Sequence, residues 1–444
     1  MDIITSLGNN VCEYYHQIGT VCPPQIQKGQ FITAAADNID HNPSSATSTG
    51  SFHGTSLSLF QNVTTESNTS DDTDRGFTHS IAHLKGQRMV KDLRIAYSEI
   101  KPTGLPSNDV YVPLTAGNLT SSCNTLSKEM EKEYDWLSHV ENLHADEISS
   151  ESNISWAAYH ASLIAEPDIF PSINAMLPLF AEEASTPSML RHCFEVIQAA
   201  VQHVNPGQIP VICVDQPLFA KMKQLQWSMD RLYGEDKFVI LLGGLHTEMT
   251  CNKVLGHWLE GSGWVEALQE AELATPGIVE SFLKASHVTR TRHAHQVTAC
   301  ALYILLKKAY DVYLTTNPQG PPESFSLWCT RRKNKSPQFL YWFTCLELEL
   351  LVLAFVRSLR TGDFELYVDT LTKLRPWFFS LNHTHYARWM SVHVRDMCSL
   401  DRTHPDVARE FQRGKFVMAK SQRKFSLIAI NHGHEQNNGV MKGE

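Results

Sequence analysis

Three acidic side chains stand in local sequences that could bring their carboxylates to one site. Asp37 and Asp215 each follow directly after an apolar run that reads as a β-strand, and Glu435 comes shortly after a third apolar run. Ligands of open α/β sheets gather where strands end. Carboxylates held there can bind a pair of divalent metal ions. The pattern predicts a Mg²⁺ or Mn²⁺ site formed by Asp37, Asp215 and Glu435.

The aspartates also have simpler interpretations. Asp37 and Asp40 lie in a stretch rich in turn-forming residues, where both would shape a turn. Asp215 precedes Pro217 at the start of a predicted helix, where it would serve as the N-cap.

Short apolar runs alternate with helical periods in the middle of the chain. They predict a strand at 209–214, a helix at 216–228, a strand at 237–242 and a helix at 244–260. Continuous apolar strands flanked by helices indicate a buried, largely parallel sheet. Long helical periods then follow up to residue 400, interrupted by a linker predicted from Pro318 to Lys335.

Further residues could bind a phosphate or a metal. His246 follows Gly243 and Gly244 at a predicted strand-to-helix turn, where glycines allow a ligand to approach closely. Arg290 and Arg292 form a cationic cluster with neighbouring histidines, although such a cluster is equally explained as the solvated start of a helix. Three His-x-His pairs occur without any Cys-x-x-Cys motif, so we expect no structural zinc.

Composition limits the classes of function. The net charge is −9, which argues against a uniformly basic, nucleic-acid-binding surface. Ten scattered cysteines, and an N-terminus without the features of a signal peptide, indicate reduced thiols and a nuclear or cytoplasmic location. The most apolar helical stretch carries Glu347 and Glu349, so no membrane association is expected.

A resemblance covers nearly the whole chain, in order. It rests on seven blocks: Asp37-Asn38-Ile39-Asp40-His41-Asn42-Pro43 with Ser51-Phe52-His53-Gly54-Thr55, Val214-Asp215-Gln216-Pro217-Leu218, Gly243-Gly244-Leu245-His246, Ser286-His287-Val288-Thr289-Arg290, Arg360-Thr361-Gly362-Asp363-Phe364, His385-Tyr386-Ala387-Arg388-Trp389 and His434-Glu435-Gln436-Asn437-Asn438. Together they resemble transposon-derived proteins similar to DDE-type transposases.

The resemblance implies an α/β fold, with a ribonuclease H-like mixed sheet interrupted by a large, mainly helical insertion. The sheet would be assembled from residues near 20–64, 205–260 and 420–440. The implied division has five parts: first core strands in 1–64, a polar loop and helical insert in 65–204, the β-α-β-α continuation in 205–260, a helical insertion in 261–419, and a core segment with the third acid in 420–444.

The resemblance also implies a function and its residues. Asp37, Asp215 and Glu435 would hold Mg²⁺ or Mn²⁺ and cleave or join DNA strands. Asp40 would be the rival of Asp37 as the first metal ligand, and His246 would lie near the site. Arg290, Arg292 and Arg388 would contact DNA phosphates, and a homo-oligomer is compatible with this activity.

Two rival interpretations stay open. The chain has nine residues after Glu435 and no DNA-recognition module before Asp37, as expected of a domesticated or truncated remnant that binds without catalysing. The other rival is a different α/β enzyme that uses Gly243 and Gly244 to bind a phosphate.

Overall fold

The computed structural model describes residues 2–41, 52–63, 97–104, 124–145, 155–165, 170–317 and 323–442. The polar segment after residue 63, for which the sequence predicts a loop, lies outside these residues. The described chain divides into two compact units. Unit 1 comprises 1–115, 167–245 and 399–444, and unit 2 comprises 116–166 and 246–398.

Unit 1 is a mixed α/β structure. Its elements are α1 (Asp2–Ile18), β1 (Thr33–His41), β2 (Phe52–Gln61), β3 (Ile173–Met176), α4 (Pro187–Val204), β4 (Val211–Val214), α5 (Gln216–Ser228), α6 (Asp230–Tyr233), β5 (Val239–Leu242), α15 (Leu400–Thr403), α16 (Pro405–Gln412), β6 (Val417–Ala419), β7 (Leu427–Ala429) and α17 (Ile430–Lys442).

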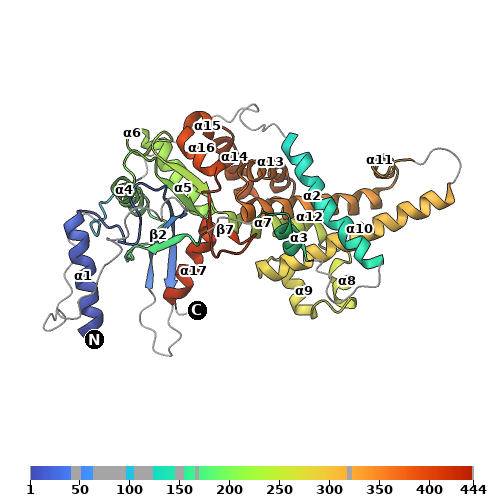
Figure 1. Ribbon diagram of the computed structural model, residues 1–444, viewed down its shortest axis with the longest axis horizontal. Coiled ribbons are helices and arrows are strands. Elements are labelled where there is room, and N and C mark those ends of the chain that lie inside the picture. Colours follow the sequence, from blue (N-terminus) through green and yellow to red (C-terminus); the bar gives the residue numbers. More distant parts are fainter. Residues whose placement is uncertain are drawn as a thin grey trace. The chain divides into compact units, whose positions relative to one another are not determined.

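A five-stranded mixed sheet in the order β3-β2-β1-β4-β5 is the centre of unit 1 (Figure 1). β4 pairs in parallel with β5, as the β-α-β-α pattern predicted, and β1 also pairs in parallel with β4. β2 is antiparallel to both of its neighbours, β1 and β3, so it is the reversed strand of this sheet. β4 and β5 are buried along their whole length, which explains their unbroken apolar sequences.

Three parts of unit 1 differ from the sequence-based prediction. β1 continues beyond Asp37 to His41, because it pairs residue by residue with β2 as far as Phe52. β3 forms where no strand was predicted. The apolar run at 425–430 does not join the main sheet: β7 pairs with β6 in a separate two-stranded sheet. The segment that follows becomes α17, which packs beside β1, β2 and β4.

Unit 2 is helical throughout its described residues. Its helices are α2 (Asn124–Ala145), α3 (Trp156–Ser162), α7 (Gly244–Leu259), α8 (Trp264–Glu270), α9 (Pro276–Leu283), α10 (Val288–Thr316), α11 (Phe325–Lys335), α12 (Pro337–Thr361), α13 (Phe364–Ser380) and α14 (Thr384–Cys398). α7 begins in unit 1 at Gly244 and continues into unit 2 from His246. The predicted linker from Pro318 to Lys335 is wrong in its second half, which forms α11.

α12 is the central helix of unit 2. It is long and apolar enough to cross a membrane by length and composition, yet 56% of its most apolar window is buried among the other helices. Its Glu349 is fully buried and hydrogen-bonds to His295 of α10 at 2.9 Å. Arg357, also on α12, pairs with Glu133 of α2 at 2.7 Å. Each buried charge on this apolar helix therefore has a polar partner, as burial requires.

One close helix contact in unit 2 depends on a glycine. A Cβ at Gly256 of α7 would lie 2.1 Å from the carbonyl oxygen of Leu283, at the end of α9. We expect Gly256→Ala to lower the free energy of unfolding by about 1–3 kcal/mol, because backbone atoms must move apart to admit the methyl group. The measurement is chemical denaturation followed by circular dichroism.

Gly277→Ala is the matched control, since a Cβ at this helical glycine would have no atom within 4 Å. It should be neutral or stabilising by up to about 1 kcal/mol, because alanine favours a helix over glycine. Equal effects of the two substitutions would show that the α7–α9 contact does not constrain the packing.

Candidate functional site

The register between β1 and β4 sets two of the predicted acids side by side. Ala35 of β1 is opposite Cys213 of β4 in the parallel pairing. Asp37 and Asp215 each lie two residues further along, at equivalent positions, and alternation along a strand directs both carboxylates to one face. Asp215 also caps α5, because its Oδ1 accepts a hydrogen bond from the Leu218 backbone N–H at 3.0 Å. The metal-ligand and N-cap interpretations of Asp215 are therefore compatible.

α17 brings the third acid to the same place. The carboxyl groups of Asp37 and Glu435 hydrogen-bond to each other, and Asp215 is close enough to act electrostatically on Asp37. All three side chains are partly exposed, so solvent and small ligands can reach them. The structure thus brings together residues that are widely separated in the sequence.

Asn431 holds the start of α17 in position. Its Oδ1 accepts a hydrogen bond from the Leu245 backbone N–H at 3.1 Å. Its backbone N–H hydrogen-bonds to the thiol of Cys213, two residues before Asp215. The Asn431 amide also lies so close to Gly243 that a Cβ there would be 2.4 Å from its Nδ2. Because Glu435 is one helical turn after Asn431, these contacts also fix the position of Glu435.

His434 fastens the same helix to β2. Its Nε2 lies 3.0 Å from the Ser56 hydroxyl and its Nδ1 lies 2.8 Å from the Ser58 hydroxyl. Ser56 in turn donates to the backbone carbonyl of Asp37, and Asn437 donates to Ser58. Burial lowers the pKa of His434 to about 4, so the imidazole is neutral at physiological pH.

The local environment makes Asp37 a weak acid. Its pKa is raised to about 8, first by burial, then by the charges of Asp215 and Glu435 and by the hydrogen bond to Glu435. At neutral pH Asp37 therefore keeps its proton and donates a hydrogen bond to Glu435. A proton occupies a position between two carboxylates where a divalent cation could take its place.

The other predicted residues lie elsewhere. Asp40 is three residues after Asp37 on β1, hence on the opposite face, and pairs with the exposed His53 at 2.7 Å. His246 lies in the first turn of α7 and belongs to unit 2. Arg292 forms a largely buried ion pair with Glu248 at 2.6 Å, whereas Arg290 and Arg388 are exposed on α10 and α14.

The acids do not form a completed metal site. Within the described ranges, no group of three or more His, Cys, Asp or Glu side chains has the arrangement needed to hold a metal ion. The carboxyl groups of Asp37 and Glu435 instead hydrogen-bond to each other through the proton that Asp37 keeps. Loss of that proton frees four oxygen atoms, which together with Asp215 supply the charge and the donor type that Mg²⁺ or Mn²⁺ prefers.

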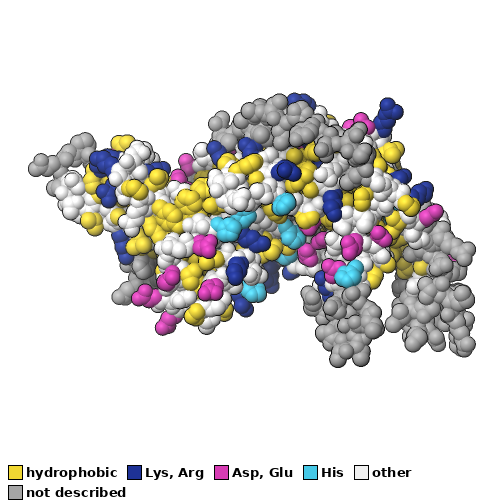
Figure 2. Space-filling model, turned by 180° about the vertical axis from the view of Figure 1, so that it is seen from behind, with side chains coloured by type: hydrophobic (Ala, Val, Ile, Leu, Met, Phe, Trp, Pro, Cys, Tyr) yellow, Lys and Arg dark blue, Asp and Glu magenta, His cyan; other side chains and the backbone are white. Residues whose placement is uncertain are grey.

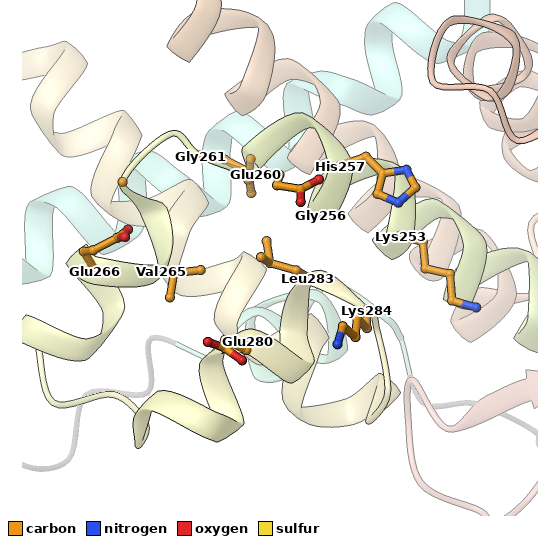
Figure 3. Close-up of a pocket in the computed structure, with 12 residues that line it drawn as sticks. Lys253, Gly256, His257, Glu260, Gly261, Val265, Glu266, Glu280, Leu283 and Lys284 are labelled. Carbon is orange, nitrogen blue, oxygen red and sulfur yellow. The ribbon is translucent and has the colours of Figure 1, made fainter.

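Unit 2 contains a hollow of about 580 Å³ between the end of α7 and the helices α8 and α9 (Figure 3). Lys253 and His257 line one side of it, and Glu266 and Glu280 line the other. His257 stacks on His383 of unit 2 with a ring-centroid distance of 4.9 Å. Because charges of both signs border this hollow, its lining does not favour one class of ligand.

Sequence reasoning missed the residues that hold the acids together. Ser56 and Ser58 alternate with buried leucines on β2, and a polar residue repeated every second position on a buried strand is a signal of an internal hydrogen-bond network. Asn431 precedes Glu435 by one helical turn and His434 is adjacent to it, so the contacts of both residues position that acid. Asn438, buried one turn further on, has neither amide atom hydrogen-bonded within the described residues.

Comparison with known families identifies one relationship. A family model described as a domain of unknown function (DUF8702) matches residues 155–319 and 322–442, more than half of the chain. The chain therefore belongs to this family. Asp215 and Glu435 fall inside the matched ranges and Asp37 lies before them. Searches of curated proteins and of solved structures gave no match.

The proton on Asp37 predicts a pH-dependent stability difference. Between the unfolded pKa of about 3.9 and the folded pKa of about 8, the folded chain keeps a proton that the unfolded chain has lost. This group therefore lowers the free energy of unfolding as pH rises, by up to about 1.4 kcal/mol per pH unit. His434 acts in the opposite direction between about pH 4 and 6.5, because its folded pKa is depressed.

Asp37→Asn removes the pH-dependent contribution of Asp37 to the free energy of unfolding and leaves the contribution of His434. The gain in stability of the variant over the wild type should be small near pH 4.5 and should grow up to pH 8, as measured by urea denaturation at several pH values. Asp40→Asn, an exposed carboxyl on the other face, should show no such growth. A stability difference for Asp37→Asn that does not change with pH would contradict the shared proton.

Proposed function

We propose that this protein is a transposase-like, metal-dependent enzyme that cleaves or joins DNA strands. The observation that carries the proposal is the meeting of Asp37, Asp215 and Glu435, which come from a central strand, the end of its parallel neighbour and a late helix. Three acidic side chains that lie close together seldom serve to stabilise a fold, because the repulsion among their carboxylates lowers the free energy of unfolding. Perturbed carboxyl pKa values of this kind concentrate at functional sites.

The architecture of unit 1 also supports the proposal. The sheet order β3-β2-β1-β4-β5, with β2 as its reversed strand, is consistent with a ribonuclease H-like core. The larger part of unit 2, residues 246–398, lies in the sequence between Asp215 and Glu435. This order agrees with a helical insertion between the second and third acids, as the resemblance to DDE-type transposases implies.

The residues of the cluster would have separate tasks. Asp37, Asp215 and Glu435 would supply the oxygen ligands, after Asp37 has released its shared proton. Divalent cations bound by such a set lower the pKa of an attacking water or hydroxyl group and stabilise the leaving oxygen. His434 and Asn431 would hold Glu435 in position, because His434 hydrogen-bonds to Ser56 of β2 and Asn431 accepts a hydrogen bond from the Leu245 backbone.

A catalytically inactive binding protein derived from a transposase is the second candidate. The Asp37–Glu435 hydrogen bond favours it, because a shared proton already reduces the repulsion between the acids without a metal. The surface is compatible with limited nucleic-acid contact: on the face shown in Figure 2, acidic and basic side chains are scattered and neither kind forms one continuous patch. Exposed Arg290 and Arg388 remain candidate phosphate contacts for both functions.

Two measurements separate these candidates. For an enzyme, Mn²⁺ should raise the melting temperature more at pH 8.5 than at pH 6, because a cation must displace the Asp37 proton. The protein should also nick supercoiled plasmid DNA in the presence of Mn²⁺. Asp215→Asn should abolish both effects while folding normally, since asparagine is as good an N-cap as aspartate.

Asp40→Asn is the matched control and should retain both effects. Nicking that persists at the wild-type rate in Asp215→Asn would show that the activity comes from a contaminant or another site. If the wild type binds DNA but shows neither Mn²⁺ stabilisation nor nicking, the inactive binding protein is the correct assignment.

A further inference from the structure

An apolar groove runs between two helices of unit 2, separately from the acids of unit 1. α10 contributes Leu302, Leu305, Leu306 and Ala309, and α12 contributes Phe339, Trp342, Phe343 and Leu346. On each helix these residues follow the spacing i, i+3, i+4, i+7, which places them in one stripe. The groove between the stripes has a volume of about 360 Å³.

The stripes include residues that a helix normally buries. Leu305 is 63% exposed, although the neighbouring Leu306 is 9% exposed and part of the core. Trp342 and Phe343 are half-buried at the floor of the groove. Two adjacent helices that both present such stripes to solvent form the surface into which a third amphipathic helix packs.

One border of the groove is basic. α11 carries Arg331, Arg332, Lys333 and Lys335 and no acidic residue. Arg331 and Lys333 pair with Glu323 and Glu347, respectively. Arg332, which lines the groove, lies over the ring of Trp328 and keeps its charge at the surface. Lys308 on α10 is also exposed, one residue before the groove residue Ala309.

We propose that this groove binds an acidic amphipathic helix of a partner protein. The two stripes each span about 10 Å, or two helical turns, which suits a short helix with its own i, i+3, i+4, i+7 apolar face. Acidic residues along the edge of that helix would meet Arg332 and its basic neighbours, which fixes its orientation and excludes basic helices. A nucleic acid is a poorer occupant, because eight of the eleven lining residues are aliphatic or aromatic and Arg332 is the one charged residue among them.

The test uses a fluorescein-labelled helical peptide with leucines at i, i+3, i+4 and i+7 and glutamates at the flanking positions. Fluorescence anisotropy with the full chain should show saturable binding. A peptide of the same composition with the leucines out of register should bind at least about tenfold more weakly, because its apolar side chains cannot share one face.

Two substitutions at exposed groove positions test the site itself. Leu305→Glu and Arg332→Glu should each weaken binding of the in-register peptide by about tenfold or more. Leu232→Glu of unit 1 and Lys284→Glu of unit 2 are the matched controls, since these exposed residues do not line the groove, and both variants should bind like the wild type. Circular dichroism establishes that all variants are folded.

Three outcomes would overturn the proposal. The first is equal binding of the two peptides. The second is wild-type affinity in both groove variants. The third is a different occupant: displacement of the peptide by a DNA oligonucleotide would indicate nucleic acid, and a wild-type dimer that Leu305→Glu converts to monomer in sedimentation would indicate a second copy of the chain.

Discussion

The parallel pairing of β1 with β4 is the constraint on which the acidic cluster depends. With Ala35 opposite Cys213, Asp37 and Asp215 occupy equivalent positions and face the same side. A shift of one residue would direct one of the two carboxylates to the other face of the sheet. The backbone hydrogen bonds between β1 and β4 hold Asp37 and Asp215 at adjacent positions whatever their charge. The repulsion between the two carboxylates is a consequence of this pairing.

α17 completes and balances this arrangement. It adds a third carboxylate, and it also brings the neutral His434 and the amide of Asn431, which bind β2 and the start of α7. The three acids of the cluster are therefore partly exposed, and the uncharged side chains that hold α17 in place, His434 and Asn431, are buried. The proton on Asp37 follows from this geometry, because two partly buried carboxyl groups in hydrogen-bond contact share one more easily than they both ionise.

The sequence predicted local elements well and long-range pairing poorly. The period of the apolar residues identified α5, α7 and the helical character of the chain that follows α7 up to residue 400, because the apolar face of a helix is set by neighbours three and four positions away. β1 extended past Asp37 because of its pairing with β2, which no local pattern specifies. α11 was mistaken for a linker because its basic residues and nearby prolines hide an 11-residue helix capped by Ser324. The sequence predicted Asp37 and Asp215 to follow strand ends, which is correct for Asp215 and wrong for Asp37, and the meeting of the three acids depends on strand register and on the docking of α17. Both are tertiary properties.

The distance along the chain between His434 and its partners has a consequence for biosynthesis. Ser56 and His434 are separated by 378 residues, and the whole of the described unit 2 is encoded between them. β1 and β2 can form a hairpin early, but α17 cannot dock until translation has passed residue 435 and the intervening helices have folded or moved aside. The acidic cluster is then assembled among the last steps of folding. Until α17 docks, Asp37 lacks the charge of Glu435 and the hydrogen bond to it, which are two of the causes that raise its pKa.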